Sequence, residues 1–268
     1  MEYHTDLENE FINDLQENGR FILSVGCKGA GKSYVMMSFL KFALYHEMFE
    51  FYHFVCPVYD GEQSGSYDFL KTQKHVQIYK SYSEKVSKEV DKSRKKGKTL
   101  FLIDDGTGQL INNFDQTFLT IISTTRHFHG CCVWACVHAM KAVLKPCIRY
   151  NVDFLLMYQC SSQGLIEDLF EIFLSRKLKK FAVFDQLFDQ VMAEKNSCIL
   201  YDGKSQQIDC NVKYWGFVVE QFNNLKPHAP IKKPEPKKSE LEKSKDLKSI
   251  FRSRLQKHKS LKRDTRPF

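Results

Sequence analysis

The segment GCKGAGKS at residues 26–33 constrains the fold of this 268-residue chain more than any other feature. It matches the pattern GxxxxGK[ST] at every fixed position. The apolar run RFILSV precedes it, and apolar residues at helical spacing follow it to about Phe49. A glycine-rich loop between a strand and a helix is the context in which this motif binds phosphate, because backbone N–H groups surround the anion at the positive helix end.

Each residue type in this loop has a chemical reason to be there. The glycines allow successive backbone N–H groups to turn toward the phosphates. A lysine at position 32 reaches the β- and γ-phosphates, and the hydroxyl at position 33 coordinates Mg²⁺. The sequence therefore predicts a site for ATP and Mg²⁺ formed by Gly26, Cys27, Lys28, Gly29, Ala30, Gly31, Lys32 and Ser33.

A second motif is an apolar run that ends in two carboxylates. LFLI at 100–103 reads as a buried strand and runs directly into Asp104 and Asp105. A P-loop NTPase needs a carboxylate at the end of a strand facing the loop, where it holds the Mg²⁺ shell. A neighbouring carboxylate can activate water as a general base. We therefore predict Asp104 in the metal shell and Asp105 as the base.

Strands and helices are expected to alternate along the chain. The patterns predict strands near 20–25, 51–55, 75–79, 99–103, 131–137 and 153–158, and a hairpin at 197–201 and 208–212. They predict further helices near 84–96, 113–127, 164–178 and 184–195. This alternation indicates an α/β fold with a mainly parallel sheet flanked by helices. The motif at 26–33 adds that the fold is of the P-loop NTPase type.

No membrane-spanning or secretory segment is expected. The longest strongly apolar run, near 131–137, is far shorter than the ~20 residues that span a bilayer. The N-terminus MEYHTDLENE is acidic and polar, unlike a secretory signal.

The net charge of +8 divides near Leu225. Residues 226–268 hold 15 Lys and Arg against 5 Asp and Glu, whereas the remaining residues hold 25 against 27. We predict an ATPase domain at 1–225, with its core at about 20–212, and a disordered basic tail at 226–268. Such a tail can bind phosphates non-specifically, and a nuclear-import signal or a capsid-docking segment would have the same composition.

Nine cysteines, an odd number scattered through apolar segments, favour a reducing intracellular compartment. Six residues suggest a zinc site by composition: His127, His129, Cys131, Cys132, Cys136 and His138. The cysteines, however, fall in an apolar run rich in strand-forming residues, where alternate side chains point to opposite faces. We therefore expect a buried strand rather than a zinc site.

Four segments, taken in order, resemble the poxvirus-type genome-packaging ATPases of the HerA/FtsK superfamily of DNA-translocating motors. They are HFVCPVYD (53–60), LFLIDD (100–105), TTRHFHGCCVWACVH (124–138) and LKPCIRYNVDFLLMY (144–158). The similarity extends from about Arg20 to Asp209. It implies a homo-oligomeric ring that packages viral double-stranded DNA, with capsid or portal-vertex proteins as partners. It also implies a location in the infected-cell cytoplasm or nucleus, or in the virion.

The resemblance also assigns roles to three residues. In such rings the active site lies between subunits, and an arginine of the neighbouring subunit contacts the γ-phosphate. Arg126 and Arg149 are both candidates for this arginine. Family members end the strand after the Arg-His pair with a glutamine that senses the γ-phosphate, whereas this chain has His138 nearest to that position. His138 is therefore the candidate sensor.

Two other functions are compatible with the same motifs. One is a virion-assembly or secretion motor of the same superfamily. The other is a non-motor protein that uses nucleotide as a switch or a structural ligand. A GTPase is disfavoured because the sequence holds no NKxD-type motif for reading guanine.

Overall fold

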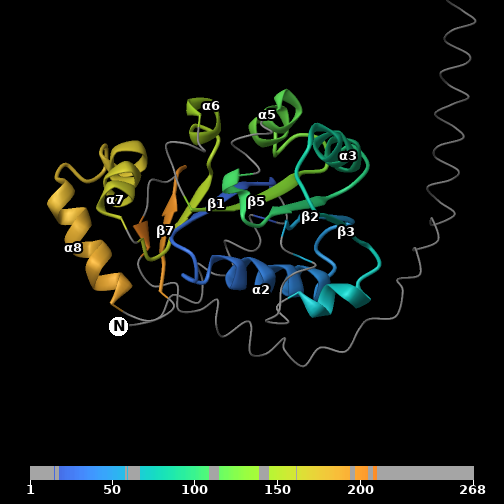
Figure 1. Ribbon diagram of the computed structural model, residues 1–268. Helices are drawn as coiled ribbons and strands as arrows, with labels where there is room; N and C mark the ends of the chain where they lie inside the picture. Colours follow the sequence, from blue (N-terminus) through green and yellow to red (C-terminus); the bar gives the residue numbers. More distant parts are fainter. Residues whose placement is uncertain are drawn as a thin grey trace, which may run out of the picture. The chain divides into compact units, whose positions relative to one another are not determined.

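The computed structural model describes residues 15, 18–57, 59, 67–108, 115–138, 145–160, 162–193, 197–204 and 208–209. Within these residues, eight strands form one sheet in the order β3-β2-β4-β5-β1-β6-β7-β8 (Figure 1). The strands are β1 (Phe21–Val25), β2 (Phe51–Val55), β3 (Val76–Tyr79), β4 (Thr99–Ile103), β5 (Cys131–Val137), β6 (Phe154–Met157), β7 (Ile199–Asp202) and β8 (Ile208–Asp209). The helices are α2 (Lys32–Tyr45), η1 (Asp68–Thr72), α3 (Glu84–Arg94), α5 (Gln116–Ser123), α6 (Pro146–Arg149), α7 (Gln163–Leu169), η2 (Phe170–Leu174) and α8 (Phe181–Met192).

The sheet is parallel from β3 to β6, and β7 and β8 join it as antiparallel strands. Parallel neighbours need long crossover connections, which the helices provide. The predicted α/β fold with a mainly parallel sheet and a C-terminal hairpin is confirmed. The predicted domain boundary near 225 and the basic tail at 226–268 lie outside the described residues.

Alternation along each strand separates two hydrophobic cores. In β1, Phe21, Leu23 and Val25 belong to one core, whereas Ile22 belongs to the other. Helix α2 packs on the Ile22 side, and α3 and α5 pack on the opposite side, so the sheet lies between two helical layers (Figure 1). A strand covered on both faces must be apolar throughout, which explains the continuous apolar runs in the sequence.

Strand β5 lies inside the sheet, and all seven of its residues are buried. Burial raises the pKa of the Cys131 thiol to about 12 and also raises the pKa values of Cys132 and Cys136. The predicted buried strand is therefore confirmed, and these thiols pack as protonated apolar groups. Within the described ranges, no group of three or more His, Cys, Asp or Glu is arranged to hold a metal ion.

Several predicted boundaries differ from the structure. Helix α2 ends at Tyr45 rather than near Phe49, because Glu47 adopts a left-handed φ of 50° and Met48 N–H donates to Ala43 O at 3.0 Å. Helix α5 is shorter than predicted, and α8 begins three residues earlier. Helices η1 and α6 were not predicted. Among the described helices, none is long and apolar enough to cross a membrane.

Candidate functional site

The loop at 26–31 leaves the carboxyl end of β1 between its two neighbouring strands. Gly26 N–H donates to Val137 O of β5 at 3.3 Å, and Cys27 N–H donates to Gln159 O, just after β6, at 2.8 Å. Gly29 and Gly31 have φ values of +80° and +95°, a region that favours glycine. Gly31 also caps α2, so the unpaired N–H groups of the first helical turn lie beside the loop. The loop thus lies outside the carboxyl ends of the parallel strands, where α/β proteins bind their ligands.

Lys32 is buried, with only 4% of its surface exposed. Its Nζ contacts three groups: Gly26 O at 2.9 Å, Cys27 O at 2.8 Å and His138 Nδ1 at 3.2 Å. An ammonium has three N–H donors, so these contacts occupy all of them. Desolvation lowers its pKa, while neighbouring acidic groups partly oppose this effect. To reach a phosphate, Lys32 would exchange one of these partners.

The two predicted carboxylates have different surroundings. Asp104 is buried, and its Oδ1 accepts a hydrogen bond from Ser33 Oγ at 2.7 Å and from Asp105 N–H at 2.9 Å. The carboxylate of Asp105 is half exposed, and its backbone has a left-handed φ of 48°. The structure thus brings together the two predicted metal-shell residues and leaves the predicted base accessible.

His138 connects the loop to the acidic pair. Its backbone N–H donates to Thr107 Oγ1 at 2.7 Å, and its ring lies between Lys32 and Asp105. We place the proton of the neutral ring on Nε2, because Nδ1 accepts from Lys32. Gly26 O lies 3.1 Å from the same Nδ1, and in this tautomer both atoms are acceptors that share Lys32 as their donor. Nε2 then faces Asp105 Oδ1 at 3.4 Å.

Two contributors to this site were not found from the sequence. Tyr67 O–H donates to Asp104 Oδ2, and Thr107 holds the backbone of His138. Burial and the adjacent Asp104 raise the pKa of Tyr67 far above its ordinary value, so the phenol remains a donor. Both residues lie in connections without periodic patterning, and no sequence signal distinguishes them from other loop residues.

Arg126 lies at the opposite end of the strands from the glycine loop, beside their amino ends. It precedes β5 and forms an ion pair with Asp153 at 3.3 Å. Asp153 precedes β6 and also accepts from the N–H of Phe21, the first residue of β1, at 2.9 Å. These three strands run in the same direction, so their amino ends are separated from the glycine loop by the length of a strand, roughly 16 Å. Arg126 is therefore not brought to the loop of its own chain.

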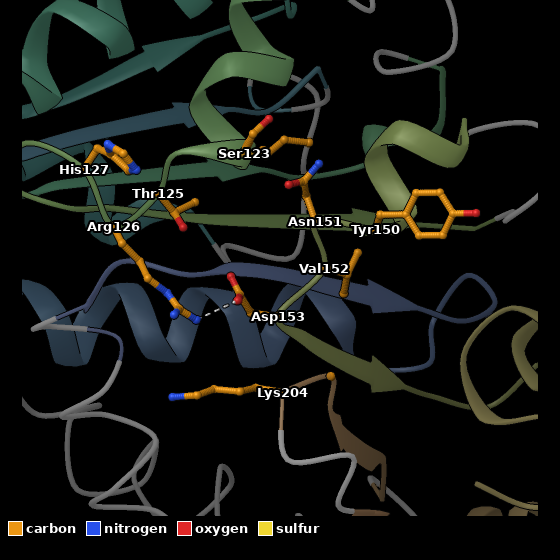
Figure 2. A pocket seen from close by; sticks show the side chains of 11 residues that line it. Ser123, Thr125, Arg126, His127, Tyr150, Asn151, Val152, Asp153 and Lys204 are labelled. Atoms are coloured by element: carbon orange, nitrogen blue, oxygen red, sulfur yellow. Dashed lines mark hydrogen bonds and ion pairs between the residues drawn. The ribbon is translucent and has the colours of Figure 1, made fainter. Parts of the chain in front are cut away.

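A pocket of about 360 Å³ surrounds this ion pair (Figure 2). Figure 2 shows Arg126 directed toward Asp153, with Lys204 below this pair and Asn151 above it. Tyr150 also lines the pocket and is largely exposed, and it directly follows Arg149, the half-buried last residue of α6. Burial raises the pKa of Asp153, although the Phe21 N–H and the neighbouring arginines oppose this effect.

These features define a class of fold. A mainly parallel sheet, a glycine loop between β1 and α2, and a carboxylate pair at the end of β4 together describe an α/β fold of the P-loop NTPase type. No protein-family model and no curated protein sequence matches this chain.

Solved structures are similar to this chain at low sequence identity. One is the genome packaging NTPase B204 from Sulfolobus turreted icosahedral virus 2 in complex with AMPPCP, at 16% identity and a TM-score of 0.54. That match covers 71% of this chain and 95% of the other. Another is the pCW3 conjugation coupling protein TcpA with ATPγS, at 15% identity and a TM-score of 0.52, covering 78% of this chain and 66% of the other. At these identities the similarity shows the fold, and the poxvirus-type affiliation stays a prediction.

Proposed function

We propose that this chain is a Mg²⁺-dependent ATPase that acts as a homo-oligomeric ring and drives viral double-stranded DNA into a capsid. One observation carries the ATPase part. Three neighbouring strands, β4, β5 and β1, bring Asp105, His138 and Lys32 into one connected cluster beside the Ser33–Asp104 pair. A glycine turn that precedes a helix by chance is not expected to lie beside two carboxylates and a histidine at the carboxyl ends of the strands.

The residues divide the chemistry among themselves. The loop N–H groups and Lys32 would bind the phosphates, and Ser33 and Asp104 would hold Mg²⁺, which neutralises charge on the phosphate oxygens. Asp105 is exposed enough to accept a proton from an attacking water. His138 would sense the phosphate through Lys32. When Lys32 moves toward a phosphate, Nδ1 of the His138 ring loses its contact with Lys32.

The positions of the arginines support a shared active site. An arginine that contacts the transferring phosphoryl group can increase the rate by ~10³–10⁵. Arg126 lies at the amino ends of the strands, away from the glycine loop of its own chain. It can therefore contact only a nucleotide that is bound to another copy. Asp153 holds its guanidinium in place within the chain. Arg149 is the alternative candidate, from the segment that leads into the same pocket.

The DNA-packaging part rests on resemblance. The four ordered motifs resemble packaging motors, and the B204 NTPase has the same fold over 95% of its length. Capsid or portal-vertex proteins are the proposed partners, and the interior of an infected cell, cytoplasm or nucleus, or the virion is the proposed location. The basic tail at 226–268 is proposed as an accessory tether, because residues outside it carry nearly balanced charge.

A second candidate is a motor of the same superfamily that moves DNA across an envelope. The similarity to the conjugation coupling protein TcpA favours it. The two candidates differ in their partner: the packaging motor should bind immature capsids of its virus, whereas the envelope motor should bind membrane-embedded partners instead.

ATP hydrolysis by the purified chain is the first test. Lys32→Ala should abolish Mg²⁺-dependent turnover, and Lys41→Ala, on the same helix, should not. Asp105→Asn should bind ATP without hydrolysing it, and Asp68→Asn, in a surface ion pair, is its control. If the wild-type chain hydrolyses no ATP with or without duplex DNA, the motor proposal is wrong.

Mixing variants tests the shared site. Rings mixed from Arg126→Ala and Asp105→Asn subunits should recover part of the activity, because some interfaces then pair an intact arginine with an intact base. Recovery with Arg149→Ala instead would assign the role to Arg149. Duplex DNA should stimulate hydrolysis even after deletion of 226–268, and loss of stimulation would instead indicate binding through the tail.

A further inference from the structure

The Asp104 carboxylate is held by donors on both of its oxygens. Oδ1 accepts from Ser33 Oγ and from the Asp105 N–H, and Oδ2 accepts from the Tyr67 hydroxyl. Rotation about the Cβ–Cγ bond exchanges the two oxygens of an aspartate. This rotation is opposed when the two oxygens have different hydrogen-bond partners. Here they differ in kind: Oδ1 faces the glycine loop through Ser33, and Oδ2 faces the buried phenol.

Tyr67 is itself held firmly. Its side chain is buried, and its ring packs against Phe54 at 5.7 Å and Tyr59 at 6.2 Å between centroids. Its carbonyl accepts from Leu70 N–H at 2.9 Å in the first turn of η1, which fixes the backbone. The hydroxyl is therefore delivered to Asp104 from a rigid part of the core.

We propose that Tyr67 is a positioning residue for the magnesium carboxylate, fixing Asp104 so that Oδ1 stays directed to Ser33. This inference rests on the proposed Mg²⁺–nucleotide site. The Ser33 hydroxyl donates its hydrogen bond to Asp104, which leaves the lone pairs of Ser33 Oγ available to a metal. Groups that orient a metal ligand from behind typically change metal affinity 10–100-fold when they are removed.

The phenylalanine substitution separates this role from packing. Tyr67→Phe keeps the ring against Phe54 and Tyr59 and removes only the hydroxyl. The matched control is Tyr59→Phe, because Tyr59 contacts the Tyr67 ring but its hydroxyl makes no hydrogen bond to Asp104. Thermal melting of each variant shows whether it is folded before its binding is compared.

The experiment measures two affinities of the full-length chain. A fluorescent ATP analogue gives the nucleotide Kd in EDTA, and a Mg²⁺ titration at saturating analogue gives the apparent Kd for the ion. Tyr67→Phe should raise the Mg²⁺ Kd by about 10-fold or more while the Kd in EDTA stays within about twofold. Tyr59→Phe should change neither value.

Each other outcome has a definite meaning. An unchanged Mg²⁺ Kd in folded Tyr67→Phe overturns the positioning role and leaves the proposed ATPase intact. Equal weakening with and without the ion also overturns it, because the effect would then lie in the loop. A wild-type chain that binds no nucleotide in Mg²⁺ overturns the proposed function and this inference together.

Discussion

Replacing Gly26 with alanine should damage both the stability of the protein and its glycine loop. A Cβ at this position would lie 2.7 Å from the Cβ of Tyr158 and 3.0 Å from Gln159 O. Neither atom can move away by a side-chain rotation, because one is a buried β-carbon and the other is a backbone oxygen that accepts from Cys27. The ends of β1 and β6 must therefore separate.

The magnitude follows from this geometry. Forcing an extra carbon into a packed site costs about 1–3 kcal/mol. For a folded unit of 150–250 residues, each kcal/mol lowers Tm by roughly 2–4 °C, so Gly26→Ala should lower Tm by roughly 2–12 °C. The affinity for ATP should also fall, because the displaced Gly26 carbonyl is one of the groups that position Lys32.

Gly29 provides the control, because the loss of stability on its substitution by alanine has a different origin. A Cβ there meets no heavy atom within 4 Å, but φ is +80°. Gly29→Ala should therefore cost about 1–2 kcal/mol through backbone strain alone, and asparagine should recover part of it, since asparagine tolerates this region. Asparagine at position 26 should bring no recovery. Thermal melting and ATP titration of both series test this, and wild-type values for Gly26→Ala would refute the reasoning.

Two further predictions concern buried polar groups. Burial lowers the pKa of His53 to about 4, and its ring bonds Tyr79 and Ser93. Because the unfolded chain binds this proton more tightly, stability should fall as pH drops from about 6.5 to 4, by up to about 3 kcal/mol. In urea titrations at pH 7 and 4.5, His53→Gln should lose less stability than wild type, and an equal loss would contradict this. Ser24→Ala should cost about 1–3 kcal/mol, because buried Trp134 Nε1–H loses its acceptor at 2.8 Å; an unchanged denaturation midpoint would show that this bond contributes nothing.

Features encoded within a few consecutive residues were predictable from the sequence. Strands β2, β4 and β5 have the expected bounds because each is an apolar run between polar or turn-forming residues. The pairing of Ser33 with Asp104 was expected because the two motifs are recognisable separately and a parallel sheet places both at its carboxyl edge.

Contacts set by packing between distant segments were not predictable. Tyr67 follows a turn-rich stretch, and its hydroxyl reaches Asp104 only because η1 packs beside β2 and β4. Helix α6 is four residues long with proline at its first position, too short for a periodic pattern to appear. His138 was singled out by resemblance, but its place between Lys32 and Asp105 follows from the order of strands in the sheet.

The glycine loop and Arg126 lie at opposite ends of the parallel strands, and this separation affects the symmetry of an assembly. In a two-fold dimer one patch faces its own copy, so Arg126 of each subunit meets the loop of the other only if a single patch contains both. In the proposed homo-oligomeric ring the contact is heterologous: the amino ends of the strands in one copy meet the carboxyl ends of the strands in the next. Such contacts continue from copy to copy until they close, so every subunit of a closed ring both donates an arginine and receives one.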